Sequence, residues 1–193
     1  MAKLYFKYGA MGSSKTAQAL ITKFNYEERG MRVWLIKPAM ETRDGRFVRS
    51  RIGLEAEAEL IEKGCDIISL FEKKAEKPDV IIADECQFLE KAQIDALRAL
   101  VDEKSIPVLA FGLRTDFRTK LFEGSKRLFE LADSISEIKT ICACGRKATV
   151  NARLGDNGEV LTLGSQVVLG GNERYIAMCH KCWTQKIKHQ EGK

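Results

Sequence analysis

Residues 4–16 read LYFKYGAMGSSKT, in which an apolar and aromatic run leads into a loop rich in glycine and serine. The run predicts a short strand, and the residues after the loop predict a helix. The loop matches the phosphate-loop pattern G-x-x-x-x-G-K-[ST] at Gly9, Lys15 and Thr16. In such a loop the backbone amides and the helix dipole bind phosphates, the lysine neutralises them, and the hydroxyl ligates magnesium. The stretch therefore predicts a nucleoside triphosphate site.

Ser14 departs from this pattern, because it stands where the second glycine belongs. If that position needs a positive φ, the serine Cβ strains the loop, and Gly12 restores part of the lost freedom. The predicted nucleotide contacts in the loop are Gly9, Ala10, Met11, Gly12, Ser13, Ser14, Lys15 and Thr16.

Short apolar runs alternate with helix-like stretches through the first two thirds of the chain. The predicted strands are residues 4–8, 33–37, 80–84 and 108–112, and the predicted helices are residues 15–28 and 89–101. This alternation favours an α/β fold of the P-loop NTPase type, with a mostly parallel sheet flanked by helices. After about residue 141 the chain becomes rich in glycine and cysteine and has no helix-length apolar pattern. We predict two units, an ATP-binding domain at 1–140 and a small β-rich, metal-containing domain at 141–193.

A carboxylate ends the predicted buried strand VIIAD, residues 80–84. Asp84 at that position can reach magnesium, because ligands gather at the carboxyl ends of parallel strands. The alternative is that Asp84 and Glu85 are only a polar strand end or a helix cap. Adjacent residues at a strand end point to different sides, so Glu85 can face an acceptor and take its proton. In an ATPase the same glutamate would activate water, and residue type alone does not separate the two roles.

An arginine-rich stretch lies between the second and third predicted strands, at residues 39–53, with arginines at 43, 46, 49 and 51. It is open to two interpretations: a solvated loop, or a segment whose guanidinium groups meet phosphate oxygens.

Four of the six cysteines form two close pairs, Cys142 with Cys144 and Cys179 with Cys182. Paired cysteines outside an oxidising compartment indicate a metal, and four thiolates predict a structural tetrahedral zinc site. His180 is an alternative ligand, and four unmetallated thiols are the other alternative. Cys65 and Cys86 are predicted to be buried small residues.

Composition sets broad limits. The chain has 193 residues, 45% of them apolar and 31% charged, with a net charge of +5 that suits an anionic ligand. No apolar run approaches the roughly 20 residues that span a bilayer, and the start of the sequence lacks a signal-peptide pattern. These features predict a cytoplasmic protein without a membrane partner.

Several motifs together resemble the type II thymidine kinase family, and the resemblance covers nearly the whole chain. The motifs, in order, are GAMGSSKT at 9–16, DECQF at 84–88, GLRTDFR at 112–118, LADSISEIKTICACGRKA at 131–148, and GGNERY at 170–175 followed by C-x-x-C. The resemblance implies that Glu85 is the base for the nucleoside 5′-hydroxyl and that Arg43 stabilises the phosphoryl group in transfer. It implies that Thr16 and Asp84 hold Mg²⁺, and that Asp84, Glu85, Cys86 and Gln87 complete the ATP site.

The resemblance also implies a nucleoside pocket and a lasso, residues 163–175, that closes over the base. The implied pocket residues are Met11, Phe88, Leu113, Phe117, Phe122, Asn151, Gln166, Val168 and Tyr175. For the apolar members, plain core packing is the alternative. The zinc would clamp both ends of the lasso, lowering the entropy lost on holding it closed.

The implied reaction moves the γ-phosphate of Mg-ATP to the 5′-hydroxyl of thymidine, and of deoxyuridine, giving dTMP for DNA precursor salvage. The family further implies dTTP as feedback inhibitor and a homotetramer. Two other readings stay open: an ATP-driven nucleic-acid-binding protein, and a nucleotide-binding regulator without turnover. The first would carry interleaved basic and aromatic residues, and no long array of this kind is present. We therefore expect no nucleic-acid partner.

Overall fold

The computed structural model describes residues 1–40, 45–167 and 174–191. Its larger part is a six-stranded sheet in the order β5-β2-β6-β7-β1-β8, and every pairing within this sheet is parallel. The strands are β1 (Leu4–Tyr8), β2 (Val33–Pro38), β5 (Glu59–Ile61), β6 (Val80–Ala83), β7 (Val108–Gly112) and β8 (Ser134–Glu137). The predicted α/β class with a mostly parallel sheet is confirmed.

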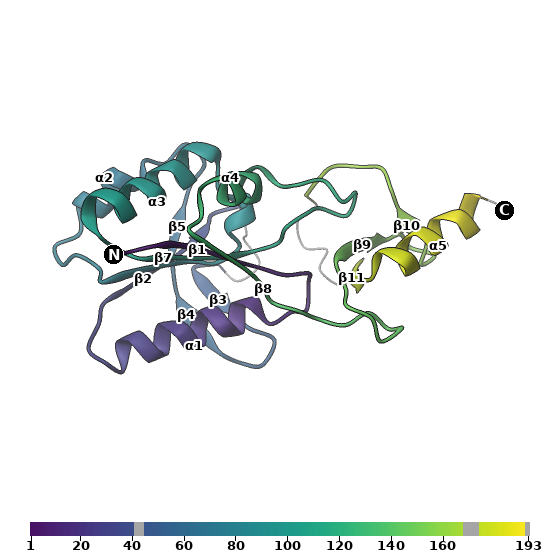
Figure 1. Ribbon diagram of the computed structural model, residues 1–193, viewed down its shortest axis with the longest axis horizontal. Helices are drawn as coiled ribbons and strands as arrows, with labels where there is room; N and C mark the ends of the chain where they lie inside the picture. The colour runs from purple at the N-terminus through teal and green to yellow at the C-terminus, as the bar shows by residue number, and fades with distance from the viewer. Residues whose placement is uncertain (41–44, 168–173, 192–193) are drawn as a thin grey trace.

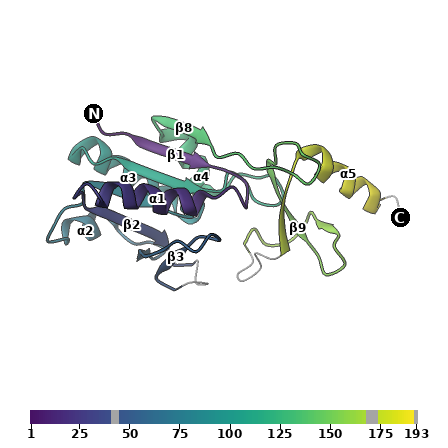
Figure 2. The same cartoon turned by 90° about the horizontal axis from the view of Figure 1, so that it is seen from below.

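Helices cover both faces of this sheet (Figure 1). One face carries α1 (Lys15–Glu27), seen in front of the sheet in Figure 2, and the other carries α2 (Ile67–Glu72), α3 (Lys91–Lys104) and α4 (Glu123–Leu131). Residues of β6 alternate between two apolar clusters, with Ile81 on the α3 side and Val80 and Ile82 on the α1 side. Because both faces are buried, the central strands read as continuous apolar runs.

The four strands expected in this part are confirmed, and the helix expected at 89–101 is found as α3, shifted slightly along the chain. The helices α2 and α4 and both edge strands of the sheet, β5 and β8, were not expected. The later half of the arginine-rich stretch and the residues just after it form a short hairpin of β3 (Phe47–Arg49) and β4 (Glu55–Glu57) next to α1. A 3-10 turn, η1 (Cys86–Phe88), follows β6 directly.

The C-terminal part is a three-stranded antiparallel sheet of β9 (Val150–Leu154), β10 (Val160–Leu161) and β11 (Tyr175–Met178), with the helix α5 (His180–Glu191) against it. The helix α5 was not expected, because the sequence has no helix-length apolar pattern in this part. The apolar side of α5 consists of little more than Trp183 and Ile187, one turn apart, packed with the cysteine cluster. A helix that buries so few residues leaves almost no periodic signal.

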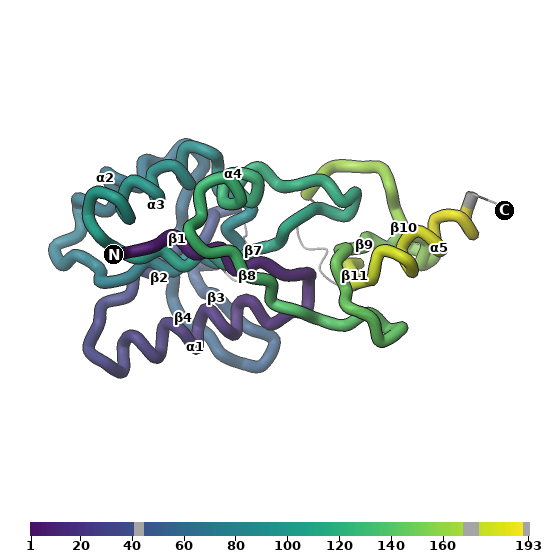
Figure 3. Tube along the Cα trace, in the orientation of Figure 1, coloured from purple at the N-terminus to yellow at the C-terminus, as the bar shows by residue number. Residues whose placement is uncertain are grey.

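This C-terminal part lies beyond the carboxyl ends of the parallel strands, the end at which the phosphate loop also lies (Figure 3). The two termini lie far apart along the molecule. Within the described ranges, none of the helices is both long and apolar enough to cross a membrane.

Candidate functional site

The loop between β1 and α1 is shaped to hold an anion. Helix α1 begins at Lys15, and the side chain of the preceding Ser14 does not cap it. The amides of the first helical turn have no partner within the helix, and the helix dipole makes their end positive. The Lys15 amine is buried and donates to the Ala10 carbonyl at 2.9 Å and to Ser13 Oγ at 3.4 Å. Burial lowers the pKa of Lys15, and the charges of Glu85 and Asp84 partly oppose that decrease.

Ser14 takes up the left-handed conformation that the loop pattern reserves for glycine, with φ 62° and ψ 26°. This conformation costs an ordinary residue about 1–2 kcal/mol. We expect Ser14→Gly to raise the free energy of unfolding by up to about 1 kcal/mol, since glycine removes the strain but loses more entropy on folding. Chemical denaturation measures the free energy of unfolding, and the KM for ATP measures whether the loop still binds the donor.

Ser105 supplies the matched control, because it caps α3 with φ 56° and lies outside the cavity described below. Ser105→Gly should give a similar gain in stability with an unchanged KM for ATP. A Ser14→Gly protein that is less stable than the parent, beside a stabilised Ser105→Gly protein, would contradict strain at Ser14.

The two residues expected to hold magnesium lie together. Asp84 directly follows β6 and is buried, and its pKa is raised to about 7, mainly by burial and then by the charge of Glu85. The nearby Thr16 hydroxyl lowers the pKa of Asp84 and so opposes that rise. One carboxylate oxygen of Asp84, Oδ1, is buried without a hydrogen-bond partner. A buried, unpartnered carboxylate oxygen beside a hydroxyl suits Mg²⁺, a cation that prefers oxygen ligands and keeps several waters.

Glu85 is held in place by its neighbour Gln87. Glu85 has φ 50°, so the chain turns sharply where β6 ends. The side-chain Nε2 of Gln87 donates to Glu85 Oε2 at 2.5 Å. The side-chain Oε1 of Gln87 accepts from the Leu113 backbone amide at 2.9 Å. Gly112 permits this approach, because a Cβ there would lie 2.6 Å from Gln87 Oε1. The strands β6 and β7 together therefore fix the carboxylate.

Lys15, Thr16, Glu85 and Gln87 line one cavity of about 390 Å³. It lies where the sheet meets the C-terminal part, with walls from both. Its lining comprises Met11, Gly12, Ser14, Lys15, Thr16, Ala17, Arg49, Ser50, Arg51, Ile52, Glu85, Gln87, Phe88, Leu113, Thr115, Asp116, Phe117, Phe122, Asn151, Gln166, Val167 and Tyr175. A volume of this size suits a small organic ligand.

The apolar wall of the cavity consists of residues expected around the nucleoside. Phe88 and Phe122 meet edge to face, with ring centroids 5.5 Å apart. Asn151, also expected there, joins the two parts of the molecule: its Oδ1 accepts from the Met11 amide at 2.8 Å, and its Nδ2 donates to the Thr115 carbonyl at 2.9 Å. Asn151 thus supports the cavity wall with both ends of its amide.

Some expected site residues do not line the cavity: Gly9, Ala10, Ser13, Asp84 and Cys86. Cys86 is wholly buried in the main core, and burial raises its pKa well above the usual range. Gly9 donates its amide to the Gly112 carbonyl at 3.2 Å and so anchors the loop to β7. Arg43 and Val168, to which roles were assigned, lie outside the described residues.

The sequence did not single out several cavity residues as site residues, among them Ser50, Ile52, Thr115, Asp116 and Val167. Arg51 belonged to the arginine-rich stretch, and its guanidinium lies near the phosphate loop, 3.9 Å from where a Cβ on Gly12 would be. Its positive charge also lowers the pKa of Lys15 slightly. The number of arginines in this stretch indicated a possible phosphate contact, but it did not identify which arginine would lie near the phosphate loop.

The four paired cysteines come together as expected. Their sulfur atoms all lie within 4.8 Å of one another, and those of Cys144 and Cys179 are 3.6 Å apart. Four sulfurs each about 2.3 Å from a tetrahedral zinc would be about 3.8 Å apart. The short C-x-C spacing is accommodated by Gly145, whose φ of 81° turns the chain back so that its amide donates to the Cys142 carbonyl.

Backbone amides also prepare this cluster for a metal. The Cys182 amide donates to the Cys179 sulfur at 3.5 Å. The backbone amides of Cys144 and Cys179 lower the pKa of the Cys142 thiol to about 6. Since the thiolate is the form that binds metal, this environment favours a cation. The residues present fit a structural Zn²⁺.

Comparison with known proteins agrees with this geometry. The family model described as Thymidine kinase matches residues 2–183. A protein named thymidine kinase from Streptococcus gordonii is 49% identical over 183 residues, which cover 94% of this chain and 95% of that protein. A thymidine kinase from Yersinia pseudotuberculosis is 44% identical over 191 residues, 97% of each chain. Because the family model covers residues 2–183 and relatives of this identity span nearly the whole chain, the chain belongs to the thymidine kinase family, a family of nucleoside kinases.

Proposed function

We propose that the chain transfers the γ-phosphate of Mg-ATP to the 5′-hydroxyl of thymidine, giving dTMP for DNA precursor salvage, and that deoxyuridine is a second acceptor. The observation that carries this proposal is a single cavity whose wall holds both Glu85 and the first turn of α1. A donor phosphate at Lys15 and Thr16 would then share one cavity with a carboxylate base. Such an arrangement favours direct transfer between two bound molecules.

Glu85 is the proposed base. As the 5′-oxygen attacks the γ-phosphorus, the hydroxyl proton passes to a carboxylate oxygen of Glu85. The bond from the γ-phosphorus to the β,γ-bridging oxygen breaks, and ADP leaves with that oxygen. Gln87 supports this role because it holds the carboxylate by a hydrogen bond of 2.5 Å.

The donor phosphates are proposed to lie on the amides of the loop and on Lys15. Mg²⁺, when bound, neutralises the β- and γ-phosphates, and Thr16 and Asp84 are the residues proposed to hold it. The unpartnered Oδ1 of Asp84 supports this assignment. Arg43 remains proposed as the group that stabilises the transferring phosphoryl.

The acceptor is proposed to lie against the aromatic wall, where Phe88, Phe117 and Phe122 offer ring surface to a flat pyrimidine. Relatives named thymidine kinase support thymidine as that acceptor. The other proposed nucleoside contacts are Met11, Leu113, Asn151, Gln166, Val168 and Tyr175.

We further propose that Zn²⁺ on the four cysteines stabilises a second unit, residues 141–193, beside an ATP-binding unit at 1–140. Each unit has apolar clusters of its own, and the cluster of the second contains Cys142, Cys179, Trp183 and Ile187. Because that core is small, a metal is needed to keep it folded.

Regulation and assembly complete the proposal. dTTP combines a thymidine with a triphosphate, so it can occupy the nucleoside wall and the phosphate loop at once and inhibit. The homotetramer is proposed from the family resemblance, and the exposed apolar side chains of α1, Phe24 at 61% and Ile21 at 47%, offer a surface for contact between copies. The arrangement of four cysteines as a metal site, and not as disulfides, supports a cytoplasmic location.

A nucleoside panel with Mg-ATP tests the reaction. Thymidine and deoxyuridine should yield 5′-monophosphates with equal amounts of ADP, while ribonucleosides and purine nucleosides should not. ATP hydrolysis that depends on nucleic acid and ignores nucleosides would favour the ATPase alternative, and ATP binding without any turnover would favour the regulator.

A further inference from the structure

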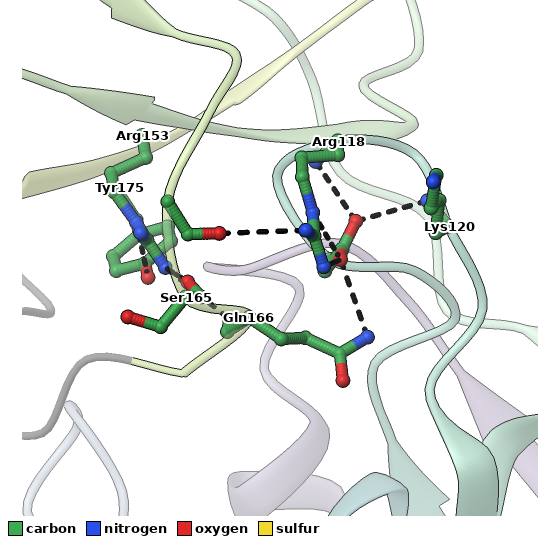
Figure 4. A network of polar contacts seen from close by, with 8 residues as sticks. Arg118, Lys120, Arg153, Ser165, Gln166 and Tyr175 are labelled. Atoms are coloured by element: carbon green, nitrogen blue, oxygen red, sulfur yellow. Dashed lines mark hydrogen bonds and ion pairs between the residues drawn. The ribbon is translucent and has the colours of Figure 1, made fainter.

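Arg153 is a buried arginine that connects three parts of the cavity wall. It lies in β9 with only 5% of its surface exposed. Its Nε donates to the Tyr175 hydroxyl oxygen at 2.7 Å, and its Nη2 donates to the Ser165 and Gln166 carbonyls at 2.9 and 3.2 Å. The guanidinium also stacks on Phe117, 3.8 Å from the ring centroid. Figure 4 shows Arg153 reaching from its strand toward Ser165 and Tyr175.

Within the described ranges, Arg153 forms no ion pair with a carboxylate. Burying a charge without a counter-ion is costly, and here carbonyl oxygens and two aromatic faces offset that cost. A neutral side chain would pack in β9 without this expense. The arginine is therefore explained by what it holds, the segment of residues 164–167, and not by the stability of its own strand.

A second arginine holds the same segment from the opposite side. Arg118 donates to the Gly164 carbonyl at 3.4 Å and to Asp116 Oδ2 at 2.9 Å. The buried Asp116 also accepts from the Arg118 and Lys120 amides, and from the Gln166 side chain at 3.2 Å. Arg118 and Gln166 thus bind the same carboxylate oxygen, Asp116 Oδ2. Three successive carbonyls, at 164, 165 and 166, are thus each bonded by an arginine.

The held segment forms part of the cavity, since Gln166, Val167 and Tyr175 line it with Phe117. The bond from Arg153 occupies the Tyr175 oxygen as an acceptor, so the phenol O–H remains free to donate to a ligand. Arg153 therefore determines both where this wall stands and which hydrogen-bonding role Tyr175 offers.

We propose that Arg153, with the Asp116–Arg118 pair, is a positioning residue that holds residues 164–167 and Tyr175 as the acceptor-side wall. This inference rests on the proposed function, because the acceptor is taken to be the nucleoside. Loss of either arginine is therefore expected to weaken nucleoside binding and to leave ATP binding unchanged, since neither arginine contacts the phosphate loop in the structure.

Steady-state kinetics test the substrate part. In Arg153→Met the KM for thymidine should rise about 10- to 100-fold, because several hydrogen bonds to a charged group are lost. The kcat should stay within a few fold and the KM for ATP within about twofold. Arg153→Lys should recover only part of the affinity, because an ammonium lacks the planar fork of donors.

Hydrogen exchange of the ligand-free protein tests the structural part without relying on activity. Peptides covering residues 162–167 should exchange faster in Arg153→Met than in the parent, while β1 and the phosphate loop should exchange as before. Arg118→Met removes a partly exposed side chain and gives a second variant if the buried change prevents folding. Arg127→Met, on α4 and away from the cavity, is the matched control and should alter neither measurement.

Unchanged exchange at residues 162–167 in both Arg153→Met and Arg118→Met would overturn the holding role. Faster exchange with an unchanged KM for thymidine would overturn the link to the acceptor. A parent enzyme that phosphorylates no nucleoside would refute the proposed function instead, and the exchange result would still decide whether the arginines hold the segment.

Discussion

Glu85→Gln is expected to abolish nucleoside-dependent ADP formation while leaving ATP binding close to intact. Glutamine has the same shape and can keep a hydrogen bond to Gln87, but it cannot accept a proton from the 5′-hydroxyl. Loss of a general base costs about 10²- to 10⁴-fold in rate. Coupled ADP release with thymidine measures turnover, and titration with a fluorescent ATP analogue measures donor binding.

Glu103→Gln is the matched control, an exposed glutamate of α3 that should change neither quantity. Turnover of Glu85→Gln at the parent rate would remove Glu85 from the mechanism. A large loss of ATP affinity in the same variant would place Glu85 in donor binding instead of proton transfer.

Removal of zinc should produce the second large effect. In Cys179→Ser, one of four ligands becomes a poor one, so metal affinity should fall by at least about 100-fold. The C-terminal unit should then unfold before the main sheet, or the KM for thymidine should rise, because the lasso loses its clamp. Chelation of the parent enzyme should have the same result.

The two tryptophans allow this order of unfolding to be observed. Trp183 packs with the cysteine cluster, and Trp34 lies in the main core. In a Trp34→Phe background, fluorescence reports the C-terminal unit alone, while far-ultraviolet circular dichroism reports the whole fold. Metal analysis of Cys65→Ser, a cysteine outside the cluster, should still show one zinc per chain. Simultaneous unfolding of both parts, with an unchanged KM, would contradict the clamp.

Local sequence signals were sufficient wherever one element carries the signal by itself. The strand, loop and helix around Gly9 to Thr16 were predicted because apolar alternation, glycine and a following helix lie within one short stretch. The cysteine cluster was predicted for a similar reason, since two close pairs leave few other chemical options. By contrast, α5 was missed because only Trp183 and Ile187 mark its buried face.

Contacts between distant segments could not be predicted. Asn151 bonds to the Met11 amide across 140 positions, and Asp116 bonds to Gln166 across 50. Nothing in the residue type distinguishes these side chains from the other asparagines and aspartates of the chain. The arginine-rich stretch was ambiguous for the same reason, until the β3–β4 hairpin placed Arg51 beside the loop.

The sequence by itself determined the chemistry of this protein: an amide-rich loop with a lysine, a carboxylate after a buried strand, and four thiols in two pairs. These follow from residue type and short spacing, which are properties of the chain before it folds. Only the tertiary structure decided which side chains share the cavity. It also decided that Arg153 is buried against residues 165–166, Tyr175 and Phe117. Such contacts depend on how two separate cores pack together, and a linear pattern contains no direct record of that packing.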